Sequence, residues 1–177
     1  MKSISNFDNH SDYWYILPAI LFIDLVVIII SRYFPTVFGS ALNVWYNTFG
    51  ISAVISDVFI IAIGFMIARW VYTRFLSKKF GMNETMFIGL LVIVQLIHDT
   101  LFYFGAILPT PRGANQMMDV FKDYAAENGG MILLADAGMM ASSAVVASIL
   151  KNSSGGFYEV FNLVMIYILP YFLTQQA

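Results

Sequence analysis

Five long apolar stretches constrain the fold of this chain more than any other feature of its sequence. Each has the roughly 20 mostly apolar residues that an α-helix needs to cross the hydrocarbon layer of a membrane. The stretches are continuous and much longer than the roughly 10-residue alternating segments of a transmembrane β-barrel. The sequence therefore predicts an all-α bundle that forms a single membrane domain over residues 1–177. The predicted spans cover residues 13–33, 51–71, 85–108, 131–150 and 157–173.

The composition excludes several other classes of protein. Charged residues make up only 11% of the chain and hydrophobic residues 59%, whereas ordinary soluble domains carry about 25% charged residues. So few charges cannot cover a water-exposed surface. The formal net charge of −2 argues against a protein that binds nucleic acid. Because the chain has no cysteine, it forms no disulfides, zinc–thiolate sites or iron–sulfur clusters.

Basic residues near the span ends predict the orientation in the membrane. On the side of the N-terminus lie Lys2, Arg74, Lys78, Lys79 and Lys151, and on the opposite side Arg32, Arg112 and Lys122. The excess of positive charge on the first side places the N-terminus inside. Arg69 falls at the inner end of the second span, where its side chain is expected to reach the lipid headgroups.

Two of the connections are predicted to form helices. The uncharged first connection contains the stretch SALNVWYNTF, which predicts a short helix in the outer interface. The loop over residues 109–130 contains a candidate N-cap at Asn115, and its pattern predicts an amphipathic helix over residues 115–128. Such a helix lies on the membrane surface or docks to a partner protein. Its apolar face contains Met117, Phe121, Tyr124 and Ala125, and its polar face Asp119, Lys122, Asp123 and Glu127. The possible docking residues are Met117, Phe121, Lys122 and Tyr124.

The fourth span is rich in small residues, which allow helices to approach closely within lipid. Gly138 and Ser142 have small-xxx-small spacing, as do Ala144 and Ser148. We therefore expect the fourth span to be the central and most enclosed helix. Self-association of the chain through this face is the alternative.

Each of the first four spans contains one aspartate, namely Asp24, Asp57, Asp99 and Asp136. An aspartate at the bilayer centre costs about 2.5–3.5 kcal/mol, so these side chains must be protonated, paired, hydrated or shallow. With a rise of 1.5 Å per residue, they lie roughly 8–14 Å from the outer ends of their spans. The sequence thus predicts a polar network in the outer half of the membrane. Its members are the four aspartates with Gln95, His98, Arg32 and Arg112, the two arginines and His98 neutralising the carboxylates.

This network has two interpretations. In the structural one, Asp57 and Asp136 cap or orient the beginnings of their helices, Asp99 and His98 bond to loop backbone or to Arg112, and the network fixes helix registry. In the functional one, the spans enclose a polar pocket that opens to the outside and holds a proton, a cation or a small polar substrate. Histidine is the side chain that titrates near neutral pH, so His98 would be the titrating group.

Motifs for known chemistry are missing. The sequence contains no HExxH, GxSxG or P-loop pattern, no potassium-channel filter, and no lysine within the last span that could hold retinal. Only one of the two histidines lies within a span, so a multi-histidine metal site is impossible; a carboxylate site for a hard cation stays open. We therefore expect no enzyme, no cofactor and no metal site.

The stretch from Gln95 to Asp136 reads QLIHDTLFYF, PRGANQMMDVFKDYAAENG and LLADAGMM in turn. It resembles a family of small multi-pass membrane proteins encoded by large DNA viruses of algae and protists. The resemblance covers about a quarter of the chain and implies a setting, the lipid membrane inside a virion, but no catalytic activity. The matching positions are Gln95, His98, Asp99, Phe102, Pro111, Gly113, Asn115, Asp119, Phe121, Lys122, Tyr124, Glu127 and Asp136.

Two functional hypotheses follow. The first is a structural or assembly protein of a virion inner membrane, derived from the host, that contacts capsid or other virion proteins through the loop over residues 109–130. The second is a small transporter or proton-coupled carrier with an outward-facing site of aspartate and histidine. The second hypothesis predicts a cavity between the first four spans that reaches past Gln95.

Overall fold

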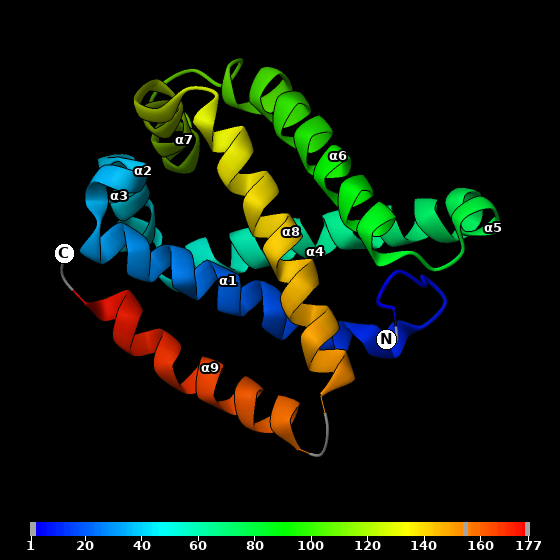
Figure 1. Cartoon of the computed structure of the whole chain (residues 1–177). Helices are drawn as coiled ribbons and strands as arrows, with labels where there is room; N and C mark the ends of the chain where they lie inside the picture. The colour runs from blue at the N-terminus through cyan, green and yellow to red at the C-terminus, as the bar shows by residue number, and fades with distance from the viewer. Residues whose placement is uncertain (1–2, 154–155, 176–177) are drawn as a thin grey trace.

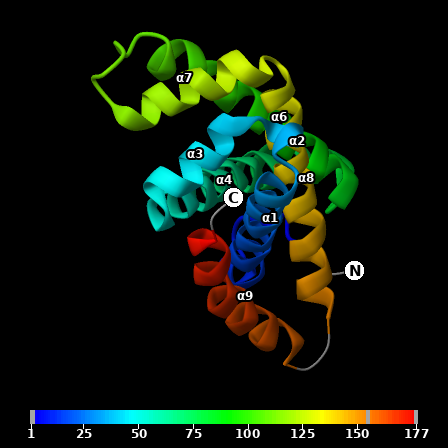
Figure 2. The ribbon, with the colours of Figure 1, turned by 90° about the vertical axis from the view of Figure 1, so that its left-hand side faces the viewer.

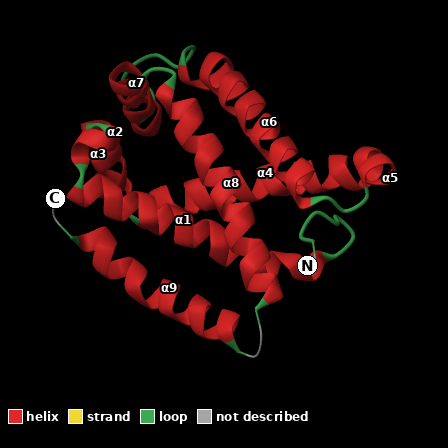
Figure 3. Ribbon diagram, in the orientation of Figure 1, coloured by secondary structure: helices red, strands yellow, loops and turns green. Residues whose placement is uncertain are grey.

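A computed structural model describes residues 3–153 and 156–175, and every regular element within these ranges is a helix (Figure 3). The predicted all-α fold is therefore confirmed. The long helices are α1 (Tyr13–Tyr33), α4 (Ile51–Val71), α6 (Glu84–Phe102), α8 (Met131–Asn152) and the slightly shorter α9 (Phe157–Thr174). Shorter elements are η1 (His10–Asp12), α2 (Pro35–Phe38), α3 (Ser40–Phe49), α5 (Ser77–Phe80) and α7 (Gln116–Asn128).

Within the described residues, five helical runs are long and apolar enough to cross a membrane. They cover His10–Tyr33, Ile51–Phe80, Glu84–Ile107, Met131–Asn152 and Phe157–Thr174. The second run continues past its predicted end at residue 71 because no glycine or proline interrupts the chain before Gly81. These runs are those of a multi-pass membrane protein.

Two of the runs contain a π-helical segment, in which the chain takes one extra residue per turn. Segment η2 (Tyr72–Leu76) joins α4 to α5, and segment η3 (Tyr103–Ile107) extends α6. The amide of Leu108 donates to the carbonyl of Tyr103 at 2.9 Å, the five-residue spacing of a π-turn. Both segments lie at one end of a span, where the helix leaves the apolar core.

The long helices run back and forth between two ends of the molecule (Figure 1). One end holds α2, α3 and α7, and Figure 2 shows α7 and α3 stacked there. The opposite end holds α5 and the N-terminal strap, our name for residues 3–12. Lys2, which contributes to the predicted orientation, lies outside the described residues.

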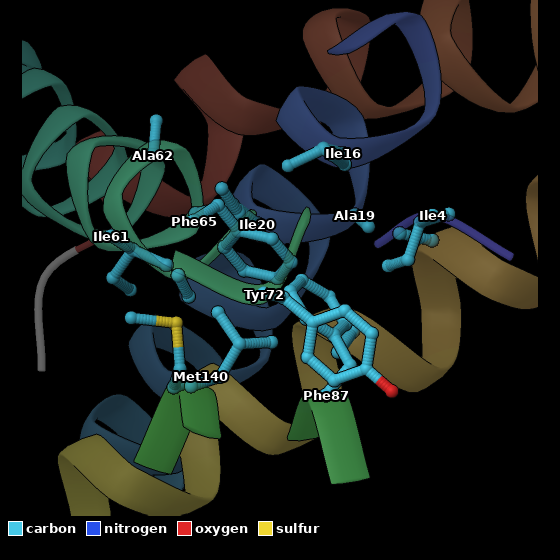
Figure 4. Packing of buried hydrophobic residues seen from close by; sticks show 14 of the residues in the cluster. Ile4, Ile16, Ala19, Ile20, Ile61, Ala62, Phe65, Tyr72, Phe87 and Met140 are labelled. Atoms are coloured by element: carbon cyan, nitrogen blue, oxygen red, sulfur yellow. The ribbon is translucent and has the colours of Figure 1, made fainter. Parts of the chain in front are cut away.

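Within the part of the chain that the structure describes, the buried apolar side chains form two main clusters. One contains Phe65, Phe87 and Met140 and lies between α1, α4, α6 and α8 (Figure 4). The other contains Trp45 and Tyr46 of α3 and lies nearer to α7. The pocket described below adjoins the second cluster, so α3 contributes both to the packing of the core and to the lining of the pocket.

The small residues of α8 pack against other helices on one face only. Ala144 and Ser148 are buried against the neighbouring helices, whereas Gly138 and Ser142 are exposed. The expectation that the fourth span is the most enclosed is wrong, because 44% of the residues in the most apolar part of the first span are buried and only 28% in the fourth. The first span packs against α3, α4, α8 and α9, which cover most of its sides. Self-association through the exposed residues stays a prediction.

Candidate functional site

A cavity of about 760 Å³ lies between α4, α6 and α8 beneath α3 and α7. This volume is typical of sites for small molecules, which occupy roughly 300–1,000 Å³. Its polar lining consists mainly of Asp57, Gln95, His98, Asp99, Asp136 and Tyr124. Its aromatic lining includes Trp45, Tyr46, Phe102, Tyr103 and Phe121. We call this space the acidic cavity.

The helix α6 contributes three polar side chains from neighbouring turns. Gln95 and Asp99 are four residues apart and therefore share a face, and Nε2 of Gln95 donates to Oδ1 of Asp99 at 2.7 Å. Nδ1 of His98 lies 3.0 Å from the same oxygen. The second oxygen of Asp99 is buried and accepts no hydrogen bond from the described residues. One carboxylate oxygen is thus held in place, and the other is buried without a partner among the described residues.

Helix α3 supplies hydrogen bonds to two of the aspartates. Nε1 of Trp45 donates to Oδ2 of Asp57 at 2.9 Å, and the hydroxyl of Tyr46 donates to Oδ1 of Asp24 at 2.8 Å. Burial raises the pKa of the Tyr46 hydroxyl, and the charges of Asp24 and Asp57 raise it further. Tyr46 therefore stays a neutral donor at physiological pH.

Asp24 stands apart from the other three aspartates. Its side chain has no exposed surface, and Oδ2 has no hydrogen-bond partner among the described residues. It is not a lining residue of the acidic cavity, but Tyr46, which binds it, is. Asp24 thus adjoins the cavity through a single tyrosine.

Asp136 of α8 faces the acidic cavity without a hydrogen bond or ion pair within the described part of the chain. It lies close enough to Asp99 and Asp57 for their charges to repel. Tyr124 of α7 is close to the same group: burial raises its pKa, and the charges of Asp136 and Asp57 add to the effect. Asp57, Asp99 and Asp136, from three different spans, therefore meet at one cavity.

The two predicted arginines do not neutralise these aspartates, so that expectation is wrong. Nη1 of Arg32 donates to Oδ1 of Asn47 at 2.5 Å, because the end of α1 faces α3. Arg112 pairs with Asp123 at 2.8 Å, and more than half of each side chain is exposed. Both basic side chains are engaged by the connections next to their spans, Arg32 by α3 and Arg112 by α7.

The structural interpretation, in which two aspartates cap helices, also differs from the structure. Helices α4 and α8 begin after Gly50 and Gly130, and neither has a side-chain capping hydrogen bond. Asp57 and Asp136 lie further along their helices and face the acidic cavity instead. Capping therefore does not account for their positions.

The amphipathic helix is confirmed, but its apolar face is turned inward. Asn115 caps α7 by accepting from the amides of Met117 and Met118. Phe121 packs against Trp45 and Phe102, with ring centroids 4.7 and 6.0 Å apart. The four possible docking residues all contact this chain: Met117, Phe121 and Tyr124 line the acidic cavity, and Nζ of Lys122 donates to the carbonyl of Thr110. The face predicted for lipid or a partner thus covers the cavity.

Helix α7 is fixed to the beginning of α3 by polar contacts. Glu127 accepts from the Ser40 hydroxyl at 2.5 Å and from the Ala41 amide at 2.9 Å, and these hydrogen bonds lower the pKa of the Glu127 carboxyl. Gly39 has φ of +77°, and a Cβ at this position would collide with the Glu127 carboxylate. A glycine is required there because the backbone turns tightly beneath Glu127.

A second polar group, which the sequence did not reveal, lies at the opposite end of the bundle. Arg69 and Asp12 have no exposed surface and pair at 3.1 Å, and Lys151 pairs with the other oxygen of Asp12 at 2.6 Å. The expectation that Arg69 reaches the headgroups is wrong because the N-terminal strap folds over it. Polar residues directly before the first span were the one available signal, and they resemble an ordinary tail.

Within the described residues, no group of three or more His, Cys, Asp or Glu side chains could hold a metal ion. No protein-family model, curated protein or solved structure matches the chain. The chemistry of the acidic cavity therefore has to be inferred from its own residues.

Proposed function

We propose that this chain is a small multi-pass membrane carrier that binds an organic cation with an apolar body in the acidic cavity. The observation that carries the proposal is an imbalance of charge. Asp57, Asp99 and Asp136 line the cavity, whereas the lining residues that the structure describes include no lysine or arginine. A positive ligand would supply the missing charge.

The walls of the acidic cavity suit the same ligand. Aromatic rings attract an ammonium group through their faces, by roughly 0.5–2 kcal/mol per contact. Trp45, Phe102 and Phe121 lie together at the cavity, so an apolar body could be buried among their rings. An inorganic cation would need a denser set of oxygen ligands than the one present.

The unpaired carboxylates favour the binding of a cation at this site. A lone aspartate within the membrane costs about 2.5–3.5 kcal/mol, and a bound cation offsets part of that cost. The partly exposed side chain of Asp99 and the unpaired carboxylate of Asp136 are the groups that would meet the ammonium. Protons could occupy the same carboxylates in the empty carrier, which would couple release of the cation to protonation.

The cellular setting is proposed from the resemblance alone: the inner membrane of a virion of a large DNA virus. A structural role, in which the loop over residues 109–130 grips a capsid protein, has less support. The apolar residues that would dock are engaged within the chain, and the exposed side of α7 carries Asp123 and Glu127. Docking to a capsid protein would have to use this polar side.

A binding experiment tests the carrier directly. The variant with Trp14→Phe and Trp70→Phe, reconstituted in lipid nanodiscs, leaves Trp45 as the only tryptophan. Its fluorescence should change saturably with phenethylammonium, whereas phenethyl alcohol and phenylacetate should bind at least tenfold more weakly. Asp57→Asn and Asp99→Asn should each weaken phenethylammonium binding at least tenfold, and exposed Asp123→Asn, the control, should leave it unchanged.

Two results would refute the proposal. One is equal binding of the ammonium and of phenylacetate, because charge would then not select the ligand. The other is unchanged affinity in both cavity variants, which would locate binding elsewhere. Uptake of labelled phenethylammonium into proteoliposomes then separates a carrier from a receptor that only binds.

A further inference from the structure

The N-terminal strap is built into the end of the bundle opposite the acidic cavity. Ile4 and Ser5 have no exposed surface, and Ile4 belongs to the core cluster shown in Figure 4. The strap thus covers the apolar core that separates this end from the cavity.

An ionic anchor holds the C-terminal part of the strap. Asp12 lies between Arg69 of α4 and Lys151 of α8, at 3.1 and 2.6 Å. Nη2 of Arg69 also donates to the carbonyls of Asn6 and Asn9, the latter at 2.8 Å. One guanidinium therefore holds three groups of the strap.

Further hydrogen bonds tie the strap to the third span and to η2. The Ser3 hydroxyl donates to Glu84 of α6 at 2.6 Å, and Lys151 donates to the Ser3 carbonyl at 2.6 Å. Thr73 of η2 accepts from the amide of Phe7 at 2.8 Å and donates to the carbonyl of Ser5 at 3.2 Å. The strap thereby joins α4, α6 and α8, the same three helices that enclose the acidic cavity at the other end.

We propose that the strap is the inner gate of the carrier, an inference that rests on the proposed function. A carrier must open each end of its binding site in turn, and α4, α6 and α8 cannot separate at this end while the strap joins them. The structure is thus a state in which the strap end is closed. Release of the strap is the step that reverses this.

The charges explain why strap release would open this end to water. Arg69 and Lys151 both pair with Asp12 while the strap is bound. When Asp12 leaves, both buried cations lose this partner, and water must enter to solvate them. Nε and Nη1 of Arg69 are buried and already lack hydrogen-bond partners among the described residues, so they can donate hydrogen bonds to that water.

Cysteine labelling tests the gate, because the chain has no cysteine of its own. Ala147→Cys places a thiol on α8, fully buried and one turn before Lys151. In proteoliposomes, Asp12→Asn should increase its rate of reaction with a membrane-impermeant methanethiosulfonate at least tenfold. Asp8→Asn is the matched control, since Asp8 lies on the same strap but pairs with Arg74 at the surface. An unchanged rate in Asp12→Asn that still binds phenethylammonium would overturn the inference.

A reversible lock covers the case in which Asp12→Asn fails to fold. Ser5 Oγ lies 3.4 Å from Sδ of Met82, so a short bis-methanethiosulfonate can bridge Ser5→Cys and Met82→Cys and join the strap to the loop before α6. Cross-linking should stop uptake of phenethylammonium but leave its binding unchanged, and reduction should restore uptake. Equal uptake in both forms would overturn the gate. Loss of binding in the unmodified chain would instead refute the proposed function, which the labelling rates do not depend on.

Discussion

At the strap end of the bundle a buried aspartate lies between two cations, whereas at the cavity end Asp57, Asp99 and Asp136 face a cavity whose described lining has no lysine or arginine. Both ends bury charge within apolar helices, but only at the strap end do opposite charges pair. Paired charge of this kind stabilises a contact between segments. Unpaired charge costs stability, and such a cost is typical of groups that are kept for a ligand.

The largest expected effect comes from the strap end, where the charges are paired. Arg69→Met leaves Asp12 with one cation and removes the donor for two strap carbonyls. Breaking one partner of a buried ion pair costs about 3–5 kcal/mol. The free energy of unfolding in detergent micelles, measured by denaturant titration, should fall by this amount. Arg74→Met, which breaks the exposed pair with Asp8, should cost no more than about 1 kcal/mol; equal losses would mean that burial is irrelevant.

A smaller effect is expected where α7 covers the acidic cavity. Gly39→Ala forces a positive φ on alanine and pushes the new Cβ into Glu127, and we expect a loss of about 1–3 kcal/mol in thermal unfolding. Gly81→Ala is the control, because Gly81 has a similar φ of +63° and no atom within 4 Å of its Cβ position. The difference between the two variants measures the contact with Glu127, and no difference would show that α7 is not held there.

At the cavity end, whose described lining has no lysine or arginine, removal of a carboxylate charge should raise the free energy of unfolding, whereas Arg69→Met lowers it. Asp136→Asn removes a charge that has no partner in the described residues, so the chain should unfold at a higher denaturant concentration. Phenethylammonium binding should weaken at least tenfold, which is about 1.4 kcal/mol. A variant that loses stability would show that Asp136 has a structural role, and the charge comparison between the two ends would then fail.

The smallest effect is a pH dependence of the contact between α3 and α7. Hydrogen bonds from Ser40 and Ala41 lower the pKa of Glu127 in the folded chain, so its contribution is present above the pKa of the unfolded chain, about 4.3. That contribution is lost as the pH falls through the lower folded pKa. Because Glu127 is exposed, we expect less than about 1 kcal/mol. Unfolding curves between pH 3 and pH 6 should show this dependence, and Glu127→Gln should remove it.

Much of the fold could be predicted because it depends on local pattern. The spans follow from length and hydropathy, and α3 and α7 follow from short segments with recognisable beginnings, such as Asn115. The meeting of Asp57, Asp99 and Asp136 at one cavity follows from similar depths in neighbouring spans. These features need no knowledge of how the helices are rotated.

The partners of the charged residues could not be predicted for a physical reason. Helix α4 is apolar on nearly every side, so its sequence does not reveal which face turns inward. The pairing of Arg69 with Asp12, 57 residues away, depends on that rotation and on the strap folding back. Likewise, the donors Trp45 and Tyr46 reach Asp57 and Asp24 only because α3 packs onto α1 and α4.

The π-turn at the end of α6 gives this helix a means of twisting. One inserted residue turns the following segment by about 100° relative to a regular helix. Moving that insertion along the chain would rotate Tyr103 and Ile107 past His98 and Asp99 while every main-chain amide still finds a carbonyl, as lipid surroundings require. Segment η3 thus turns the side chains that follow it relative to those of α6 without breaking the helix.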